Sequence, residues 1–287
     1  MYGLGIGLVL TSTSAHAGWN VLAKRAGPAG TAYVAATAAA SATLWAAPVL
    51  ALLLVTGYRP SRTGVVFLIG AGVLHTTYFL ALARAYRGHD LSVVYPVARG
   101  VAPLAASAVA VALLGDRVTP LGVLGILAIS LGVLALGWPG RQGATPSLRG
   151  VGWGLGIAAV ITAYTVWDAH SVASLGTPPL VQEWAGEAGR ALLLAGWVAH
   201  HQDRVRRAVR RYRREIVGQS LLSPASYLLV LTAYRYAPVT VVAPLREVGV
   251  LLGVVAGIRL FGEPAGRRRL LAAALVVVGA GMVAMGG

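Results

Sequence analysis

The amino-acid sequence repeats itself at an offset of 148 residues, and the repeat runs through four hydrophobic segments. The matching stretches, first copy against second, are SAHAGWN (14–20) and TAYTVWD (162–168), Tyr86-Arg87 and Tyr234-Arg235, and SVVYP (92–96) and TVVAP (240–244). Gly115-Asp116 matches Gly262-Glu263 at an offset one residue shorter. A hydrophobic chain made of two related halves is typical of secondary transporters. The repeat therefore predicts a membrane protein with two copies of one helical unit.

Composition supports a membrane protein, because 57% of the 287 residues are hydrophobic and only 11% are charged, against about 25% charged in soluble domains. A hydrocarbon core of about 30 Å needs about 20 apolar residues per helix. Windows that meet this need begin near Tyr2, Ala29, Gly64, Leu91, Thr119, Gly150, Pro178, Ile216, Pro238 and Arg269. We therefore expect an all-α polytopic membrane protein with about ten transmembrane helices, arranged as two five-helix inverted repeats.

The boundary between the halves is predicted from residues 137–150, GWPGRQGATPSLRG, because their Gly, Pro, Gln and Ser content does not suit a lipid-facing helix. We expect a first repeat at 1–138, a linker at 139–149 and a second repeat at 150–287. The first segment lacks a basic n-region and aligns with the sixth, so we expect a helix there and not a cleavable signal peptide. Asp90 and the pair Thr119-Pro120 are predicted to start the fourth and fifth helices.

Several chemistries are excluded or disfavoured by what the sequence lacks. It has no cysteine, which excludes disulfides, thiolate nucleophiles and iron–sulfur clusters. It has no H-E-x-x-H, G-x-S-x-G or Walker A motif, and its six histidines do not cluster at zinc spacing. We therefore expect no enzyme, no metal and no cofactor, and any transport must be facilitated or driven by a gradient.

Seven arginines fall within RVRRAVRRYRR, from Arg204 to Arg214, in a chain of net charge +15. We interpret this segment as a cytoplasmic loop that contacts anionic lipid. No nucleic-acid-binding motif accompanies the charge, so no nucleic-acid partner is expected. Because most other basic residues also follow odd-numbered segments, the positive-inside rule places both termini outside.

Polar residues recur inside the predicted membrane helices, where a central charge costs about 2.5–3.5 kcal/mol and needs a partner or a water-filled cavity. On the first helix, Ser12, His16, Asn20 and Lys24 form one stripe at a spacing of four. We expect a substrate site built by both halves, from His16, Trp19, Asn20, His75, Tyr78, Tyr95, Arg99, Tyr164, Trp167, Asp168, Tyr227, Arg246 and Glu247. For the two tryptophans and His75, packing is the alternative interpretation.

The intramembrane charges leave two interpretations open. Glu187 and Arg190 lie three residues apart on one helix and can neutralise each other. Arg99 and Glu247 occupy equivalent positions of the two repeats. In one interpretation, Arg99 and Glu247 form a structural bridge. In the other, Arg99 or Arg246 faces a cavity and holds an anionic group. Asp168 and Glu183 are the candidates to carry a coupling proton, because both are intramembrane carboxylates.

The sequence resembles the EamA-like family of the drug/metabolite transporter superfamily over nearly its whole length. The resemblance rests on the five-plus-five repeat, on the stretch from LARAYRGHDLSVVYPVARG to LLGDRVTPLGVLGILAISLGV (82–133), and on LFGEP (260–264) in the second copy. Gly115-Asp116 stands where the family usually has Gly-Glu. SAHAGWNVLAKR and DLSVVYPVARG are similar to the branch associated with phosphonate utilisation.

The resemblance implies ten helices around a central cavity, export of small metabolites or amino-acid-like solutes, and both termini in the cytoplasm, against the charge count. We expect an exporter of a small polar metabolite with an anionic group, located in the bacterial inner membrane as a monomer or homodimer. The alternative function is a flippase for a lipid-linked sugar or isoprenoid phosphate, which would need a lateral opening between helices and a basic patch at the headgroup level.

Overall fold

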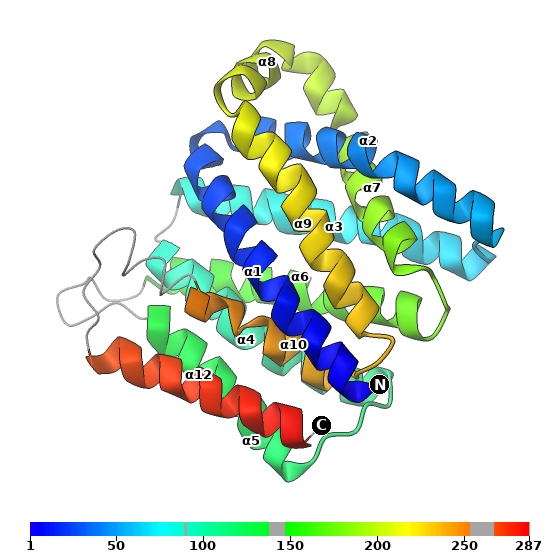
Figure 1. The fold of residues 1–287 in the computed structure, drawn as a ribbon. Helices are drawn as coiled ribbons and strands as arrows, with labels where there is room; N and C mark the ends of the chain where they lie inside the picture. Colours follow the sequence, from blue (N-terminus) through cyan, green and yellow to red (C-terminus); the bar gives the residue numbers. More distant parts are fainter. Residues whose placement is uncertain (89–90, 138–146, 253–266, 287) are drawn as a thin grey trace.

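Every regular element of the described chain is a helix, as the computed structural model shows for residues 1–88, 91–137, 147–252 and 267–286 (Figure 1). In lipid, helices satisfy their own backbone hydrogen bonds, which suits so apolar a chain. The first half holds α1 (Tyr2–Ala26), the short 3-10 helix η1 (Gly27–Ala29), α2 (Thr31–Thr56), α3 (Arg62–Gly88), α4 (Leu91–Leu113) and α5 (Pro120–Gly137). The second half holds α6 (Leu148–Ala173), α7 (Pro179–His200), α8 (Gln202–Arg211), α9 (Arg213–Ala233), α10 (Val239–Arg246) and α12 (Arg267–Gly286).

Six helices are long and apolar enough to cross a membrane: α2, α3, α4, α6, α9 and α12. This finding supports an integral membrane protein. Helices α1 and α7 have 25 and 22 residues but fall outside that set, because they carry polar stripes. Helix α5 is apolar and has 18 residues, and α10 has eight. The sequence predicted about ten spans, so six of them meet this criterion of length and composition.

Helices α5 and α12 pack against each other in antiparallel fashion through small residues (Figure 1). A Cβ atom placed on Gly125 would lie 2.7 Å from the carbonyl oxygen of Gly279, and one on Gly132 would lie 2.9 Å from that of Ala272. The two backbones therefore approach as closely as small residues allow in membrane helices. The other large helix contacts are α4 with α5, α6 and α10, α1 with α9, α3 with α6 and α7, and α2 with α7 and α9.

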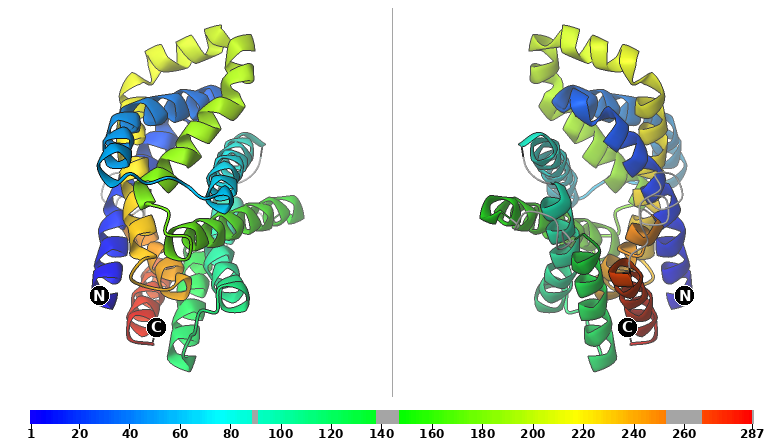
Figure 2. Two further views of the ribbon diagram at one scale, coloured as in Figure 1. Left: turned by 90° about the vertical axis from the view of Figure 1, so that its right-hand side faces the viewer. Right: turned by 90° about the vertical axis from the view of Figure 1, so that its left-hand side faces the viewer.

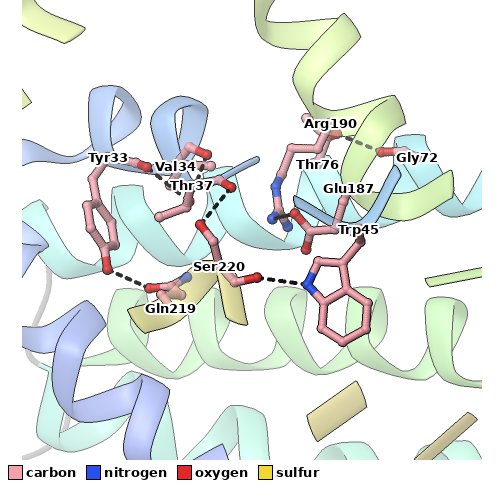
Figure 3. Close-up of polar contacts among 10 residues, drawn as sticks. All are labelled: Tyr33, Val34, Thr37, Trp45, Gly72, Thr76, Glu187, Arg190, Gln219 and Ser220. Carbon is pink, nitrogen blue, oxygen red and sulfur yellow. Dashed lines mark hydrogen bonds and ion pairs between the residues drawn. The ribbon is translucent and has the colours of Figure 1, made fainter. Parts of the chain in front are cut away.

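Helices α2 and α9 are joined by polar contacts as well as by packing (Figure 3). The Tyr33 hydroxyl donates to Gln219 Oε1 at 2.7 Å, the Trp45 indole donates to the Ser220 carbonyl at 3.0 Å, and the Ser220 hydroxyl donates to the Thr37 carbonyl at 3.3 Å. Interhelical hydrogen bonds of this kind hold helices together where the hydrophobic effect between them is weak.

The arginine-rich segment is helical, which corrects the prediction of a loop. Arg204 to Arg211 lie on α8, and Arg213 and Arg214 begin α9. In Figures 1 and 2, α8 lies at one end of the molecule, and both termini lie toward the opposite end. Helix α8 was missed because only Val205 and Ala208 pack inward, too few to give an apolar period.

Caps mark several helix starts. Helix α5 begins at Pro120, and the Thr119 hydroxyl accepts a hydrogen bond from Gly122 N at 3.1 Å, which confirms the predicted cap. Helix α6 begins at Leu148, two residues before the expected boundary, because Ser147 Oγ accepts from Gly150 N at 3.0 Å. Asp116 of the Gly-Asp pair accepts from Thr240 N at 3.2 Å, at the start of α10. The predicted cap Asp90, most of the linker and the LFGEP stretch lie outside the described residues.

Candidate functional site

The centre of the candidate site is Asp168 of α6, whose side chain is fully buried. His75 Nε2 from α3 lies 2.8 Å from Oδ2, and the Tyr227 hydroxyl from α9 donates to the same oxygen at 2.6 Å. Gln182 Nε2 from α7 donates to Oδ1 at 2.8 Å. A buried carboxylate needs such partners, because its charge is costly to remove from water. Four helices thus meet at one intramembrane acid.

The orientation of Gln182 is fixed by its own neighbours. The Ser171 hydroxyl donates to Gln182 Oε1 at 2.7 Å and lies 3.0 Å from Thr177 Oγ1. The amide nitrogen of Gln182 is therefore the atom that faces Asp168. The sequence analysis did not select Gln182. A signal was present, because Gln182 is a polar residue in the first turns of an apolar helix, next to Glu183.

A second charged group joins the two repeats through Arg99 of α4 and Glu247, which directly follows α10. Arg99 Nε lies 3.0 Å from Glu247 Oε2, as an ion-pair contact rather than an aligned hydrogen bond. The side chains are 4% and 5% exposed. Arg99 Nη2 also lies 3.2 Å from His16 Nε2 on α1. The structural bridge between Arg99 and Glu247, one of the two interpretations left open by the sequence, is therefore present. His16 lies beside it.

Arg246, the neighbour of Glu247, is buried without an acidic partner. It is 8% exposed, and no carboxylate lies within 4.0 Å of its guanidinium group in the described part of the chain. Its Cζ atom lies 5.3 Å from the centre of the Tyr227 ring. The ring of Tyr227 thus connects this cation to the Asp168 carboxylate, which the Tyr227 hydroxyl contacts.

Four aromatic rings pack against one another beside these groups: His75, Tyr78, Tyr164 and Tyr227. The ring centre of Tyr164 lies 4.8 Å from that of His75, 5.5 Å from that of Tyr78 and 6.1 Å from that of Tyr227. His75 and Tyr227 are 5.3 Å apart. Tyr78 and Tyr164 are 9% and 4% exposed, and His75 and Tyr227 are partly buried. The rings offer apolar faces with polar edges, a combination that suits a small amphiphilic ligand.

Helix α7 adds three charges to this part of the molecule. Arg190 Nη2 pairs with Glu187 Oε2 within the helix, as predicted (Figure 3). The Arg190 Cζ atom also lies 3.9 Å from the centre of the Phe79 ring. Glu183 is 5% exposed, and its carboxylate makes no hydrogen bond to any described residue. Glu183 is therefore a buried acid that forms no ion pair within 4.0 Å in the described part of the chain, although Arg190 of the same helix interacts with it electrostatically.

The remaining predicted residues lie at the edge of this cluster or away from it. Trp19 is buried, with its ring 4.9 Å from that of His16, and Asn20 donates to the His16 carbonyl at 2.8 Å. Trp167 faces away from the cluster: it stacks on Phe67 at 4.1 Å and donates to its carbonyl at 2.8 Å. This is the packing role that the sequence left open. Tyr95 is partly buried on α4, one turn before Arg99.

Metal binding finds no support in the described part of the chain, where no group of three or more His, Cys, Asp or Glu side chains could hold an ion. Asp168 and His75 are two potential ligands only, and both are engaged with each other. The arrangement can hold an anionic group through a guanidinium, stack a flat or apolar moiety, and exchange a proton at a carboxylate.

Comparison with known proteins gives a fold but no family. No family model and no curated protein match the sequence. A solved structure, described only as "Crystal structure of protein", is similar to this chain with a TM-score of 0.79. The similarity covers 99% of this chain and 98% of the other, at 18% sequence identity. At this identity the likeness speaks for the fold alone.

Proposed function

We propose that this chain is a secondary transporter of the bacterial inner membrane that exports a small, polar, amino-acid-like metabolite with an anionic group. The observation that carries the proposal is Arg246, a buried cation with no carboxylate within 4.0 Å among the described residues. An unpaired charge is expensive inside a membrane protein, so such residues mark substrate or ion pathways. An anionic substrate would supply the missing partner.

Two five-helix inverted repeats are the architecture that we propose for this function. The helices of the two halves begin at matching positions: Tyr2 and Leu148, Thr31 and Pro179, Arg62 and Arg213, Leu91 and Val239, and Pro120 and Arg267. Each half has five such helices. A chain that crosses the membrane an odd number of times ends on the side opposite its start, so the second half would begin on the opposite side and be inverted relative to the first. The proximity of both termini to one end of the molecule fits an even total (Figure 2).

The contacts support the same symmetry. Gly125 faces Gly279, and Gly132 faces Ala272. Ala272 lies 147 residues after Gly125, and Gly132 lies 147 residues before Gly279, so the two contacts are related by the repeat. Glu247 lies 148 residues after Arg99, so the ion pair between them joins equivalent positions of the two halves. A two-fold axis between the halves would pass close to both contacts. Repeats related in this way place substrate sites near the axis, where the polar cluster lies.

The substrate chemistry follows from the groups around the four rings. Arg246 would bind a carboxylate or phosphonate through its planar fork of donors. Tyr78, Tyr164 and Tyr227 would pack against the body of the solute. Glu183 would attract an amine, because it forms no ion pair within 4.0 Å in the described part of the chain. Asp168 and Glu183 are the carboxylates proposed to carry a coupling proton. The resemblance to EamA-like drug/metabolite transporters supports this class of substrate and the direction of export.

One observation favours the flippase as a second candidate function. A surface groove of about 390 Å³ runs between α3 and α6, lined mainly by Ala81, Trp153, Gly156 and Ile157, with Arg149 beside it. An apolar groove next to a basic residue could admit a lipid-linked phosphate from the bilayer. A fluorescent phospholipid assay in vesicles would detect this activity, and Arg149→Gln would reduce it.

The proposal is tested by profiling the metabolites in the medium of cells with and without the protein. We expect one polar, anionic solute to accumulate with the wild type and not with Arg246→Gln. Arg235→Gln is the matched control, because Arg235 is exposed just after α9 and its side chain donates one hydrogen bond to a described residue, the Thr177 carbonyl at 3.3 Å. Normal export by a well-inserted Arg246→Gln variant would refute the role of Arg246. No change in the medium with the wild type would refute export.

A further inference from the structure

Helix α8 lines an open surface pocket far from the buried cluster. In Figure 1, α8 lies at the end of the molecule opposite the termini. The cavity is about 540 Å³, which is within the usual range of about 300–1,000 Å³ for ligand sites. One wall is formed by η1 and the first turn of α2, and the other by α8 with the last part of α7. The residues that matter for binding are Trp197, Arg204, Arg207, Arg211 and Tyr212.

The three arginines lie on one face of α8. They are spaced by three and four residues, so that their side chains leave the same side of the helix over about two turns. All three are exposed, and in the described part of the chain no carboxylate lies within 4.0 Å of any of them. The pocket thus concentrates three positive charges without a protein counter-charge.

The aromatic walls of the pocket are held in place by local contacts. The Trp197 ring stacks on His201 with ring centres 4.4 Å apart and planes 10° apart. His201 Nδ1 lies 2.9 Å from the Trp197 carbonyl. The Arg211 Cζ atom lies 5.6 Å from the centre of the Tyr212 ring. These contacts place two aromatic rings beside the arginines on the wall of the pocket.

We propose that this pocket binds a phosphate ester, with the phosphate held by Arg204, Arg207 and Arg211 and the organic part packed against Trp197 and Tyr212. Guanidinium groups bind phosphate with paired, charge-assisted hydrogen bonds, and three of them match a doubly charged group better than a carboxylate. The site is at the edge of the bundle, next to the ends of α2, α7 and α9. A phospholipid headgroup or a soluble phosphate compound could therefore reach it.

The test compares two triple variants that remove the same charge. R204Q/R207Q/R211Q removes the pocket arginines, and R206Q/R210Q/R214Q removes three that do not line it. The purified full-length proteins are first compared by size-exclusion chromatography. Native mass spectrometry then measures retained phosphatidylglycerol against phosphatidylcholine. Calorimetric titration with inorganic phosphate, in phosphatidylcholine nanodiscs, measures binding of the free anion.

We expect the wild type and the control variant to bind one of the two probes, and the pocket variant to bind it about tenfold or more weakly. Loss of phosphatidylglycerol would identify a lipid site, and loss of phosphate binding alone would identify a site for a soluble ester. Equal loss in both triple variants would mean general charge attraction and would overturn the proposal. It would also be overturned if the wild type bound neither probe.

Discussion

Asp168 shows how a charge can be kept inside this membrane protein and still be available for function. Its two oxygens receive contacts from His75, Tyr227 and Gln182, which come from three different helices. These contacts tie α6 to α3, α7 and α9 at one buried carboxylate. Glu183 lies in the same region without such partners.

The first prediction concerns proton coupling at these two acids. Asp168→Asn and Glu183→Gln remove a titratable group while keeping nearly the same shape. If export is proton-coupled, at least one variant should give a flux that no longer varies with pH, measured as efflux of the exported solute from loaded vesicles. Asp203→Asn, which neutralises an exposed acid on α8 away from both residues, serves as the control. Unchanged pH profiles in both test variants would remove these residues from the coupling mechanism.

The second prediction concerns the bridge between Arg99 and Glu247. Arg99→Gln leaves a buried carboxylate without its cation, a change that typically costs about 3–5 kcal/mol. We expect the single variant to melt at a clearly lower temperature in detergent, and R99Q/E247Q to recover much of that loss because neither charge remains. Thermal unfolding followed by tryptophan fluorescence measures both. A single variant as stable as the wild type would show that the bridge does not hold α4 to α10.

The sequence predicted the charged members of the site better than their partners. His16, Arg99, Asp168 and Glu247 were selected because charge inside an apolar helix needs an explanation, and the structure places each of them in a buried polar contact. Trp167 was selected because it matches Trp19 in the sequence repeat and lies next to Asp168, but one residue along a helix turns a side chain by about 100°. Trp167 therefore faces Phe67, although Asp168 next to it faces the cluster.

At the scale of helices, the polar residues of the site lower the apolar character of the helices that carry them. Helices α1 and α7 fall outside the six clearly apolar spans for this reason, although their lengths are sufficient. The sequence predicted the helix starts to within about three residues, because breaks in the apolar windows coincide with Pro, Gly and Thr. Helix α8 was missed because its regularly spaced residues are arginines, and a helix was expected only where apolar residues recur at helical spacing.

The third prediction concerns the close contact of α5 and α12. Gly279→Ala would place a methyl group 2.7 Å from the Gly125 carbonyl oxygen, so the helices must separate. We expect a loss of about 1–3 kcal/mol, seen as a lower melting temperature in detergent. Gly281→Ala is the control on the same helix, because its added methyl group meets nothing within 4 Å. Equal melting temperatures of the two variants would argue against this interface.

At the scale of the whole molecule, the repeat relates features that are far apart in the chain. Equivalent helices pack on each other in the pairs α5 with α12 and α2 with α7, and the bridge joins equivalent residues of α4 and the end of α10. The sequence offset predicted which residues correspond and left an Arg99–Glu247 bridge open as one of two interpretations, and the structure shows that the two side chains meet.

The fourth prediction is the orientation of the chain. Helix α8 and both termini lie at opposite ends of the molecule (Figure 2). Seven arginines in residues 204–214 should keep α8 in the cytoplasm, which places the termini outside. A C-terminal reporter that fluoresces only in the cytoplasm should therefore stay dark, and one inserted after His201 should be bright. A bright C-terminal reporter would show that the orientation implied by the EamA-like resemblance overrides loop charge.

Cysteine labelling distinguishes a buried polar cluster that lines a path for a polar solute from one that is a sealed core. The chain has no cysteine, so one introduced thiol gives no background. His16→Cys places a thiol beside Arg99, and Ala106→Cys, a residue 1% exposed in the apolar core, is the control. With a membrane-impermeant maleimide on intact and permeabilised cells, we predict that His16→Cys reacts and Ala106→Cys does not. If His16→Cys is as unreactive as Ala106→Cys under both conditions, the cluster is a sealed structural core and the transport path lies elsewhere.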